Sequence, residues 1–596
     1  MIWSLTASSA HLSNRQAEIV AKSFPHIFED SAIAQKFSVG KDKLGYLVNH
    51  GLYPHFQELV LDCMGSSDFF AVSYDESLNK IAQKTQMDIH IRYVDKKTGL
   101  TQTRYLNSEF LTESKAVDLL SHLKSSLCKS TTLDRIVSVA MDGPNVNWKM
   151  LNDLKLEMES EYPSGPRLIE FGSCALHVVH GALKTGHDVV KWPIASYLRK
   201  SYYFFSGFPS RKSQFSKITG SSTFPPKFSL TRWCINASAS RAAQELLPDI
   251  DKFVKEVGKM PTSKVFASLK EMLKDPFLAA KLGFFSGVAA QLERFLTFYQ
   301  SENPLVPFLH DDLYHLLKSL LKRVLKPEIY DRIKTPGDMF KLELDTAGVY
   351  VHPQDLDLYH SAKSGLRATK DGKDKKSVLK FKTECLEYLK ATIKKIMQRS
   401  PLKYAITRGM SCLSPEVILQ PSQLRLDKCI EKFMDCRRVT GEEGDLIRED
   451  YVSIQESPAA KTLLRSFDKY KDRLDQLFLD IGHLVKLSPA FRKFTNLILV
   501  NFHGNASVER GFSINKHCLA ENLLEESLVA RRMVCEQVGP AGAPEKVELT
   551  NPLLLSCKNS NARWKETLKR KRDEKISSSS EEAKRRKVIL SYVRDM

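Results

Sequence analysis

The spacing of apolar residues changes character twice along this chain of 596 residues. Up to Ser66, apolar residues recur at helical spacing, as in NRQAEIVAKSF and KDKLGYLVNHGLYPHFQELVLDCM. The next segment contains short runs typical of strands: DFFAVSYD, MDIHIRYV, TQTRYLNSEFL, RIVSVAMDG and RLIEFGS. After Ser173, helical periodicity dominates over about 300 residues. The pattern therefore predicts a helical leader, a strand-rich segment and a long helical region.

The order of the strands predicts a fold. Helices are expected over TESKAVDLLSHLKSSL and VNWKMLNDLKLEMESEY, and a hairpin turn at residues 95–99. The order is then strand, strand, strand, helix, strand, helix, strand. Three hairpin-connected strands followed by two crossover units are typical of an α/β RNase H-like core with a mixed five-stranded sheet.

Composition narrows the class of protein. Lysine and arginine number 89 and aspartate and glutamate 70, which gives a formal net charge of +19. This excess favours a polyanionic partner such as nucleic acid, although many soluble proteins are basic without binding one. A hydrophobic content of 42% excludes a wholly disordered chain. No apolar run reaches the ~18 residues of a membrane-spanning helix, and the start lacks the features of a secretory signal.

The 11 cysteines are scattered, and none forms a Cys-x-x-Cys pair. This pattern disfavours both a disulfide scaffold and a zinc ribbon. We therefore expect a reducing compartment and no structural zinc in this chain.

Two aspartates are predicted to end strands, Asp75 after DFFAVSY and Asp142 after RIVSVAM. The first and fourth strands of an RNase H-like sheet lie side by side and parallel, so their carboxyl ends would bring these carboxylates together. A divalent cation between the carboxylates would offset their repulsion. Mg²⁺ held there can support phosphodiester chemistry. Alternatively, each aspartate is an ordinary turn residue after a strand.

A third carboxylate could come from HGNASVERGFSINKH, where Glu509 and Arg510 lie on a predicted helix. The alternative is an ordinary surface Glu–Arg pair. A role for Glu509 beside Asp75 and Asp142 requires that the long helical region is an insertion that interrupts the catalytic fold.

Two further pairs are candidates for function. Cys174 and His177 form half a zinc site or a thiol–imidazole pair, but we prefer a core cysteine and a histidine that contacts the acids. In KFSLTRWCINASASR, Trp233 could stack on an unpaired base and Arg232 could hold a phosphate. The alternative for Trp233 is a core position near a helix start.

The C-terminal tail contains two basic clusters separated by an acidic, serine-rich spacer, and its low complexity predicts disorder. The clusters are typical of a bipartite nuclear localisation signal, or of a solvated tail that touches nucleic acid non-specifically. Their residues are Lys569, Arg570, Lys571, Arg572, Lys584, Arg585, Arg586 and Lys587.

Together these residues resemble the hAT superfamily of DNA transposases (hobo, Activator, Tam3 and their domesticated relatives). The ordered set of matching pieces spans about residues 68–535. It consists of Asp75, Asp142-Gly143-Pro144-Asn145, Cys174-x-x-His177, Arg232-Trp233 and Ser507-Val508-Glu509-Arg510-Gly511-Phe512-Ser513, followed by NLLEESLVARRM.

The resemblance implies cut-and-paste transposition of DNA with Mg²⁺ or Mn²⁺ by a D-D-E acid triad. Asp75, Asp142 and Glu509 would be the catalytic, metal-binding residues, and Trp233 would stack near the cleaved strand. Supporting residues would be Cys174, His177, Asn145 and Arg510. The C-terminal region would form a homodimer or a larger homo-oligomer in the nucleus through Phe512, Leu523, Leu524 and Leu528.

These expectations divide the chain at definite positions: a helical leader at 1–66, the first part of the RNase H-like core at 67–177, an all-helical insertion domain at 178–487, the completion of the core with the dimerisation region at 488–540, and a disordered basic tail with the nuclear localisation signal at 541–596.

One departure from the family pattern concerns DNA recognition. Family members often begin with a BED zinc finger, yet Cys63 is the only cysteine before Asp75. Two hypotheses follow. The chain is a transposase that cleaves and joins DNA, or it is a domesticated, non-catalytic nuclear protein that associates with chromatin and dimerises.

Overall fold

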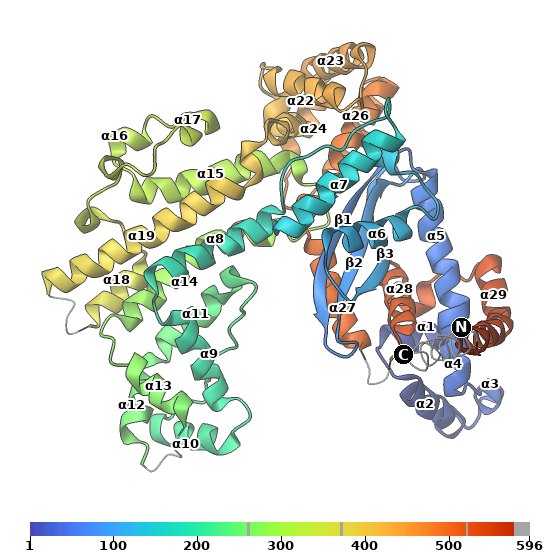
Figure 1. Cartoon of the computed structure of the whole chain (residues 1–596), viewed down its shortest axis with the longest axis horizontal. Coiled ribbons are helices and arrows are strands. Elements are labelled where there is room, and N and C mark those ends of the chain that lie inside the picture. The colour runs from blue at the N-terminus through green and yellow to red at the C-terminus, as the bar shows by residue number, and fades with distance from the viewer. Residues whose placement is uncertain (259–262, 370–373, 520–522, 577–596) are drawn as a thin grey trace, which may run out of the picture. The chain divides into compact units, whose positions relative to one another are not determined.

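The computed structural model describes residues 1–258, 263–369, 374–519 and 523–576, and these form two compact units (Figure 1). Unit 1 consists of Met1–Val137, Lys149–Pro163 and the described part of Ser507–Met596. Unit 2 consists of Ser138–Trp148 and Ser164–Ala506. Each unit is therefore assembled from segments that are far apart in the sequence.

The sheet contains four strands among the described residues: β1 (Phe70–Asn79), β2 (Lys84–Val94), β3 (Thr101–Leu111) and β4 (Ile136–Ala140). It is mixed, with the order β3-β2-β1-β4. The pairs β1–β2 and β2–β3 are antiparallel, and Gly99, at the hairpin between β2 and β3, has a φ of 71° that suits glycine. The first and fourth strands are neighbours, as the sequence predicts.

The predicted fifth strand, RLIEFGS, is not a strand in the structure. Residues 167–173 follow an irregular path, although most of their apolar side chains are buried. The Arg167 N–H donates to the Cys436 carbonyl at 2.8 Å, and the Arg438 side chain donates to the Arg167 carbonyl at 3.0 Å. Two backbone groups of this segment thus form hydrogen bonds with a loop of unit 2 and not with a strand. This corrects the prediction of a five-stranded sheet.

Helices of unit 1 cover both faces of β2 and β3. Asn107 and Glu109 of β3 bond to Ser126 and His122 of α6, whereas other polar groups of the sheet meet α27 and α28. The helical elements are α1 (Ile2–Ser9), α2 (Asn14–Ile27), α3 (Ala32–Lys36), α4 (Lys41–Leu47), η1 (Val48–Leu52), α5 (Tyr53–Ser66), α6 (Ala116–Leu127), η2 (Leu133–Arg135), α27 (Ala506–Cys518), α28 (Glu525–Ala541), η9 (Pro544–Lys546) and α29 (Asn551–Lys558).

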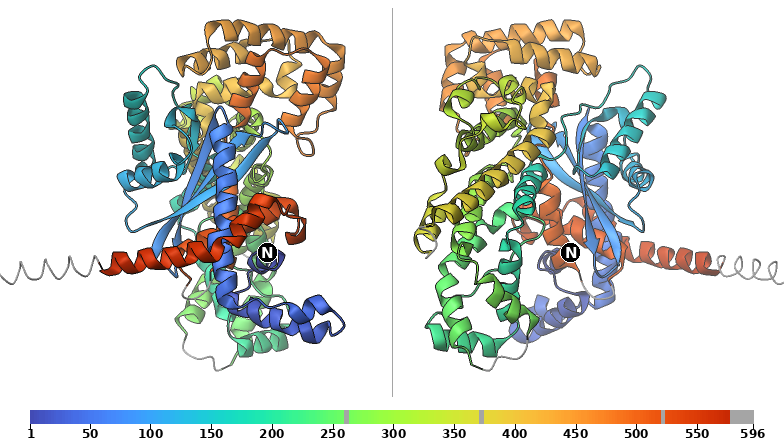
Figure 2. Two further views of the ribbon diagram at one scale, coloured as in Figure 1. Left: turned by 90° about the vertical axis from the view of Figure 1, so that its right-hand side faces the viewer. Right: turned by 60° about the vertical axis from the view of Figure 1, so that its left-hand side comes forward.

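The C-terminal segment belongs to unit 1, and its described part is largely helical. Residues 560–576 continue the helical path after α29, and Figure 2 shows this segment in red. Trp564 stacks on Tyr46 with ring centroids 5.5 Å apart, and Ser556 donates to the Gly51 carbonyl at 2.8 Å. These contacts with the leader correct the prediction of disorder up to residue 576. The rest of the predicted tail lies outside the described residues.

Apart from the last residues of β4, which begin unit 2, the regular elements in the described part of this unit are helices. α7 (Asn145–Glu161) contributes residues to both units. The remaining elements are α8 (Ala175–Val190), α9 (Ile194–Phe205), α10 (Pro209–Thr219), η3 (Trp233–Ile235), α11 (Asn236–Glu245), α12 (Leu247–Glu256), α13 (Lys264–Met272), α14 (Leu278–Phe298), α15 (Val306–Val324), α16 (Pro327–Tyr330), α17 (Pro336–Phe340), η4 (Ala347–Val349), η5 (Pro353–Asp355), α18 (His360–Arg367), α19 (Lys375–Arg399), η7 (Pro401–Lys403), α20 (Ala405–Met410), η8 (Ser411–Leu413), α21 (Pro415–Ile418), α22 (Leu424–Asp435), α23 (Gly441–Glu456), α24 (Pro458–Ser466), α25 (Leu474–Leu484) and α26 (Pro489–Leu499).

A glycine sets the closest approach between α8 and α19. A Cβ atom on Gly186 would lie 2.3 Å from the Thr392 hydroxyl and 2.8 Å from the Tyr388 ring. The Tyr388 hydroxyl also donates to the Leu183 carbonyl of α8 at 3.1 Å. The absence of a side chain at Gly186 therefore lets the backbone of α8 pack directly against the side chains of Thr392 and Tyr388 in α19.

The compact units do not follow the predicted domain boundaries. The leader, β1 to β3 and the C-terminal segment fold together as unit 1, while Asp142 and residues 164–177 belong to unit 2 with the helical region. Within the described part of the chain, no helix combines the length and the apolar character that crossing a membrane requires.

Candidate metal centre

Two of the three predicted acids meet within unit 1. Asp75 lies on β1 and Glu509 in the first turn of α27, and both side chains are half-buried. A carboxylate oxygen of each lies within 4.8 Å of the other. The structure therefore brings together two carboxylates that are far apart in the sequence, as the prediction of an interrupted fold requires.

Asp75 does not end its strand, because β1 continues to Asn79. The Asp75 Oδ1 atom accepts a hydrogen bond from the Glu76 N–H at 2.8 Å. In the register of β1 and β2, Asp75 lies directly opposite Asp88. Opposed residues on neighbouring strands share a face of the sheet, so Asp75 and Asp88 point to the same side. The predicted strand-end position of Asp75 is thus wrong, since pairing with β2 extends β1.

The position of α27 against the sheet explains why Glu509 reaches Asp75. Asn515, two turns of helix further on, donates to Asp88 Oδ2 at 2.7 Å. Gly511 lies between them, and a Cβ atom there would come within 2.6 Å of the buried Arg532 guanidinium and 3.4 Å of Asp88. The glycine permits the close approach, and the Asn515–Asp88 bond fixes the helix on the same face as Asp75.

A buried polar network underlies this face. Asp88 is fully buried, and its Oδ1 accepts from Gln86 at 2.9 Å and from Ser108 at 2.6 Å. Burial raises the pKa of Asp88, although Arg532 and the hydrogen-bond donors act in the opposite direction. Arg532, also fully buried, pairs with Glu536. These interactions join the sheet to α27 and α28.

Sequence reasoning missed this network. In MDIHIRYV the residues at every second position, Asp88, His90 and Arg92, are polar. Such alternation ordinarily marks a solvent-facing side of a strand, yet all three residues are buried. Arg532, which lies in the mostly apolar stretch LVARRM, was the available signal that a charged group from another element covers this face.

The third predicted acid lies in unit 2, beside His177. Asp142 follows β4 by two residues, as predicted, and its Oδ1 atom lies 2.6 Å from His177 Nδ1. Burial alone would lower the pKa of His177, but neighbouring Cys174 and Asp142 raise it above its usual value. The direction of this shift favours the protonated imidazole beside Asp142.

Cys174 is a core residue that fixes the start of α8. Its side chain is 5% exposed, and its Sγ atom accepts from the Asn505 N–H at 3.3 Å. Its own N–H donates to the Met141 carbonyl, next to Asp142, at 2.9 Å. The preferred interpretation of this pair, a buried cysteine and a histidine that contacts an acid, matches the structure.

Trp233 is a core residue rather than an available stacking platform. It is 5% exposed, its indole N–H donates to the Leu230 carbonyl at 2.9 Å, and its ring lies 4.9 Å from that of His187. Phe228 makes a further edge contact at 5.4 Å. The expectation that Trp233 stacks on a base is therefore wrong for this conformation. Arg232 beside it is half-buried.

The other supporting residues are at the surface: Asn145 begins α7 and Arg510 lies on α27, and both side chains are exposed. The positively charged residues at 569–572 are also exposed, on the helical segment, and Lys571 pairs with Glu526 at 2.8 Å. The second basic cluster, 584–587, lies outside the described residues.

The predicted dimerisation face is divided. Leu524 is 64% exposed, but Leu528 is 2% exposed within the core of unit 1. α28 begins only at Glu525, so the two leucines do not share a helical stripe. Phe512 and Leu523 are half-buried. The prediction that Leu528 contributes to a surface for self-association is thus wrong, because α28 packs against α1, α5 and β3.

Comparison with protein-family models and with curated proteins gives no match for this chain.

Proposed function

We propose that this chain is a hAT-type, transposase-like protein that cleaves and transfers DNA strands with a divalent metal ion. The observation that carries the proposal is the approach of Asp75 and Glu509 within unit 1. Two half-buried carboxylates on facing elements repel each other, and a divalent cation bound between them would offset that repulsion.

The donor set suits a hard cation. Carboxylate oxygens are the ligands that Mg²⁺ and Mn²⁺ prefer. When bound, such an ion would activate an attacking oxygen and stabilise a leaving oxygen of a phosphodiester. Asp75 offers its carboxylate from a paired strand. Glu509 offers its carboxylate from the first turn of α27.

Asp142 completes the proposed triad on grounds of connectivity. It follows β4, the neighbour of β1 in the sheet, by two residues. In this proposal His177 is a positioning residue, because its Nδ1 atom lies 2.6 Å from one oxygen of Asp142. The strand order β3-β2-β1-β4 supports an RNase H-like core, in which the first and fourth strands are adjacent.

The remaining parts of the proposal concern the binding partners of the chain and its location in the cell. A net charge of +19 favours DNA as the substrate. The exposed basic cluster at 569–572 supports import into the nucleus. The exposed Leu524 is the residue of the C-terminal region best placed to contribute to a homodimer.

A second candidate function is a domesticated, non-catalytic nuclear protein that associates with DNA or chromatin and dimerises. The burial of Trp233 favours it, because that side chain does not offer a surface to an unpaired base.

Nicking of supercoiled plasmid by the full chain, in Mg²⁺ or Mn²⁺, separates the two candidates. We expect nicking that Asp142→Asn abolishes and that Asp68→Asn, a change at an 81% exposed side chain, leaves intact. A chain that nicks no DNA in either ion, yet behaves as a dimer or larger in solution, supports the non-catalytic candidate instead.

A further inference from the structure

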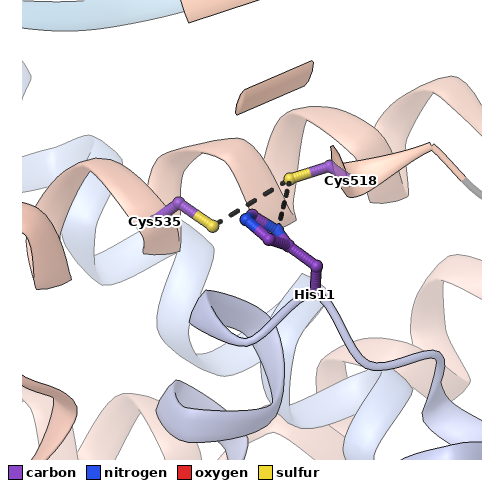
Figure 3. Close-up of side chains that lie close together, drawn as sticks. All are labelled: His11, Cys518 and Cys535. Atoms are coloured by element: carbon purple, nitrogen blue, oxygen red, sulfur yellow. Dashed lines mark hydrogen bonds between the residues drawn. The ribbon is translucent and has the colours of Figure 1, made fainter. Parts of the chain in front are cut away.

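Unit 1 contains a second group of possible metal ligands, separate from the carboxylates. His11 follows α1, Cys518 ends α27 and Cys535 lies in α28, so the three come from segments that the sequence separates widely. One donor atom from each lies within 4.8 Å of the others. Figure 3 shows the imidazole and the two thiols pointing toward one another.

The distances between the donors suit a tetrahedral zinc ion. The Cys518 Sγ atom lies 3.7 Å from His11 Nδ1 and 4.0 Å from the Cys535 Sγ atom. Zinc binds thiolate sulfur at about 2.3 Å and imidazole nitrogen at about 2.0–2.1 Å, so its ligands are spaced by roughly 3.5–3.8 Å. The two distances from Cys518 differ from this spacing by only a few tenths of an ångström, and all three donors lie within 4.8 Å of one another. A disulfide would instead need the sulfurs to approach to about 2.05 Å.

The chain holds these donors in place through residues that are not ligands. His11 has a φ of 57°, in the left-handed region that histidine adopts only occasionally. Buried Arg531 donates to the Leu12 carbonyl at 3.0 Å and to the Asn14 side chain at 2.7 Å, which fixes the backbone just after His11. His517 stacks on the His11 ring with centroids 5.2 Å apart. The imidazole is therefore oriented before any ion binds.

Burial and chemistry favour zinc over the hard cations. Cys518 is 2% exposed, whereas His11 and Cys535 are half-buried. Two thiolates cancel the charge of a divalent ion, and sulfur and imidazole donors select zinc rather than Mg²⁺. Three protein ligands leave the fourth tetrahedral position for water.

We propose that His11, Cys518 and Cys535 bind one zinc ion, which fastens the turn after α1 to α27 and α28. The site is independent of the proposed DNA chemistry, since none of its ligands belongs to the acid triad. Because its ligands come from both ends of the chain, the ion would stabilise the packing of the leader against the C-terminal segment of unit 1.

The test uses the full chain purified from zinc-supplemented cells under reducing conditions, with metal content measured by mass spectrometry. We expect about one zinc per chain, a loss of most of it in Cys518→Ser and in Cys535→Ser, and full retention in Cys128→Ser, a change at an exposed cysteine of the same unit. Wild-type protein without zinc, or variants that retain it, would overturn the proposal.

A second measurement does not depend on the folding of the variants. Cobalt exchanged into the wild-type chain should give the intense near-ultraviolet absorption of thiolate-to-cobalt charge transfer, together with visible bands typical of tetrahedral coordination. A spectrum of hydrated octahedral cobalt would contradict the site. A Cys518–Cys535 disulfide in non-reducing peptide mapping of freshly purified protein would contradict it as well.

Discussion

The carboxylates of Asp75 and Glu509 lie within 4.8 Å of each other, although one belongs to the first strand and the other to a helix near the end of the chain. The segment between them in the sequence includes all of unit 2, so unit 1 is completed only after a long insertion. This closure depends on the docking of α27, which leads to the first prediction.

Asn515→Ala should destabilise unit 1 and weaken metal binding at Asp75 and Glu509. The substitution removes the donor to Asp88 Oδ2 at 2.7 Å and leaves part of a fully buried carboxylate unsatisfied. Losses of this kind cost about 1–3 kcal/mol. Denaturant unfolding measures the loss, with Ser513→Ala, a change at an exposed position of the same helix, as the control. Equal stability of the two variants would show that the bond does not fix α27.

Two glycines of α8 should respond oppositely to alanine. In Gly186→Ala the new Cβ atom would meet Thr392 at 2.3 Å, so we expect a loss of about 1–3 kcal/mol as α8 and α19 move apart. Gly181→Ala meets no atom within 4 Å and should stabilise the helix by up to about 1 kcal/mol. Thermal unfolding of the two variants tests the packing of unit 2, and a stabilising Gly186→Ala would refute it.

The stability of unit 2 should fall with acid because of His180. This buried imidazole accepts the Cys234 N–H at Nδ1 over 3.2 Å, and burial lowers its pKa to about 3, assisted by His177 and Arg232. The unfolded chain takes up a proton near pH 6.5, whereas the folded chain does not until about pH 3. The stabilisation is therefore complete above pH 6.5 and declines as the pH falls toward 3.

Between pH 7.5 and pH 5 this linkage should cost about 2 kcal/mol. His180→Asn, which can keep an acceptor for the Cys234 N–H, should remove that part of the pH dependence. Urea unfolding of both proteins at each pH provides the comparison. An unchanged slope of stability against pH in the variant would show that His180 is not the group responsible.

The two leucines at the start of α28 should behave differently. Leu528→Ala empties a core position that is 2% exposed and should cost about 2–5 kcal/mol. Leu524→Ala alters a side chain that is 64% exposed and should change stability by less than about 0.5 kcal/mol. If Leu524 contributes to a dimer, its substitution should shift the sedimentation profile toward monomer. Equal destabilisation by both substitutions would contradict the conclusion that Leu528 is a core residue and Leu524 a surface residue.

The periodicity of apolar residues predicted the local elements well, but it predicted little of how distant segments pack together. The four strands and most helices follow from apolar spacing, and Asp142 lies after β4 as expected. The segment 167–173 is apolar enough for a strand, but nothing in it reveals that its backbone bonds to a loop at residues 436–438. Periodicity indicates which side chains are buried, but it does not indicate which residues form hydrogen bonds with the backbone of a segment.

The candidate site shows the same limit. A pair of acids at Asp75 and Glu509 could be predicted, whereas the buried Asp88 that anchors α27 could not. Its strand alternates as a solvent-facing strand does, and the compensating groups lie on helices more than four hundred residues later. The cluster of His11, Cys518 and Cys535 could not be predicted for a related reason, because its residues come from distant segments and share no local motif.

Binding of Mn²⁺ to the full chain, followed by electron paramagnetic resonance, tests the proposed metal centre most directly, because it requires no knowledge of the DNA that the protein recognises. Asp75→Asn and Glu509→Gln should each weaken binding at least tenfold, a loss of about 1.4 kcal/mol. Asp68→Asn, at an exposed carboxylate, should bind as the wild type does. Equal affinity in all four proteins would contradict the assignment of Asp75 and Glu509 as metal ligands.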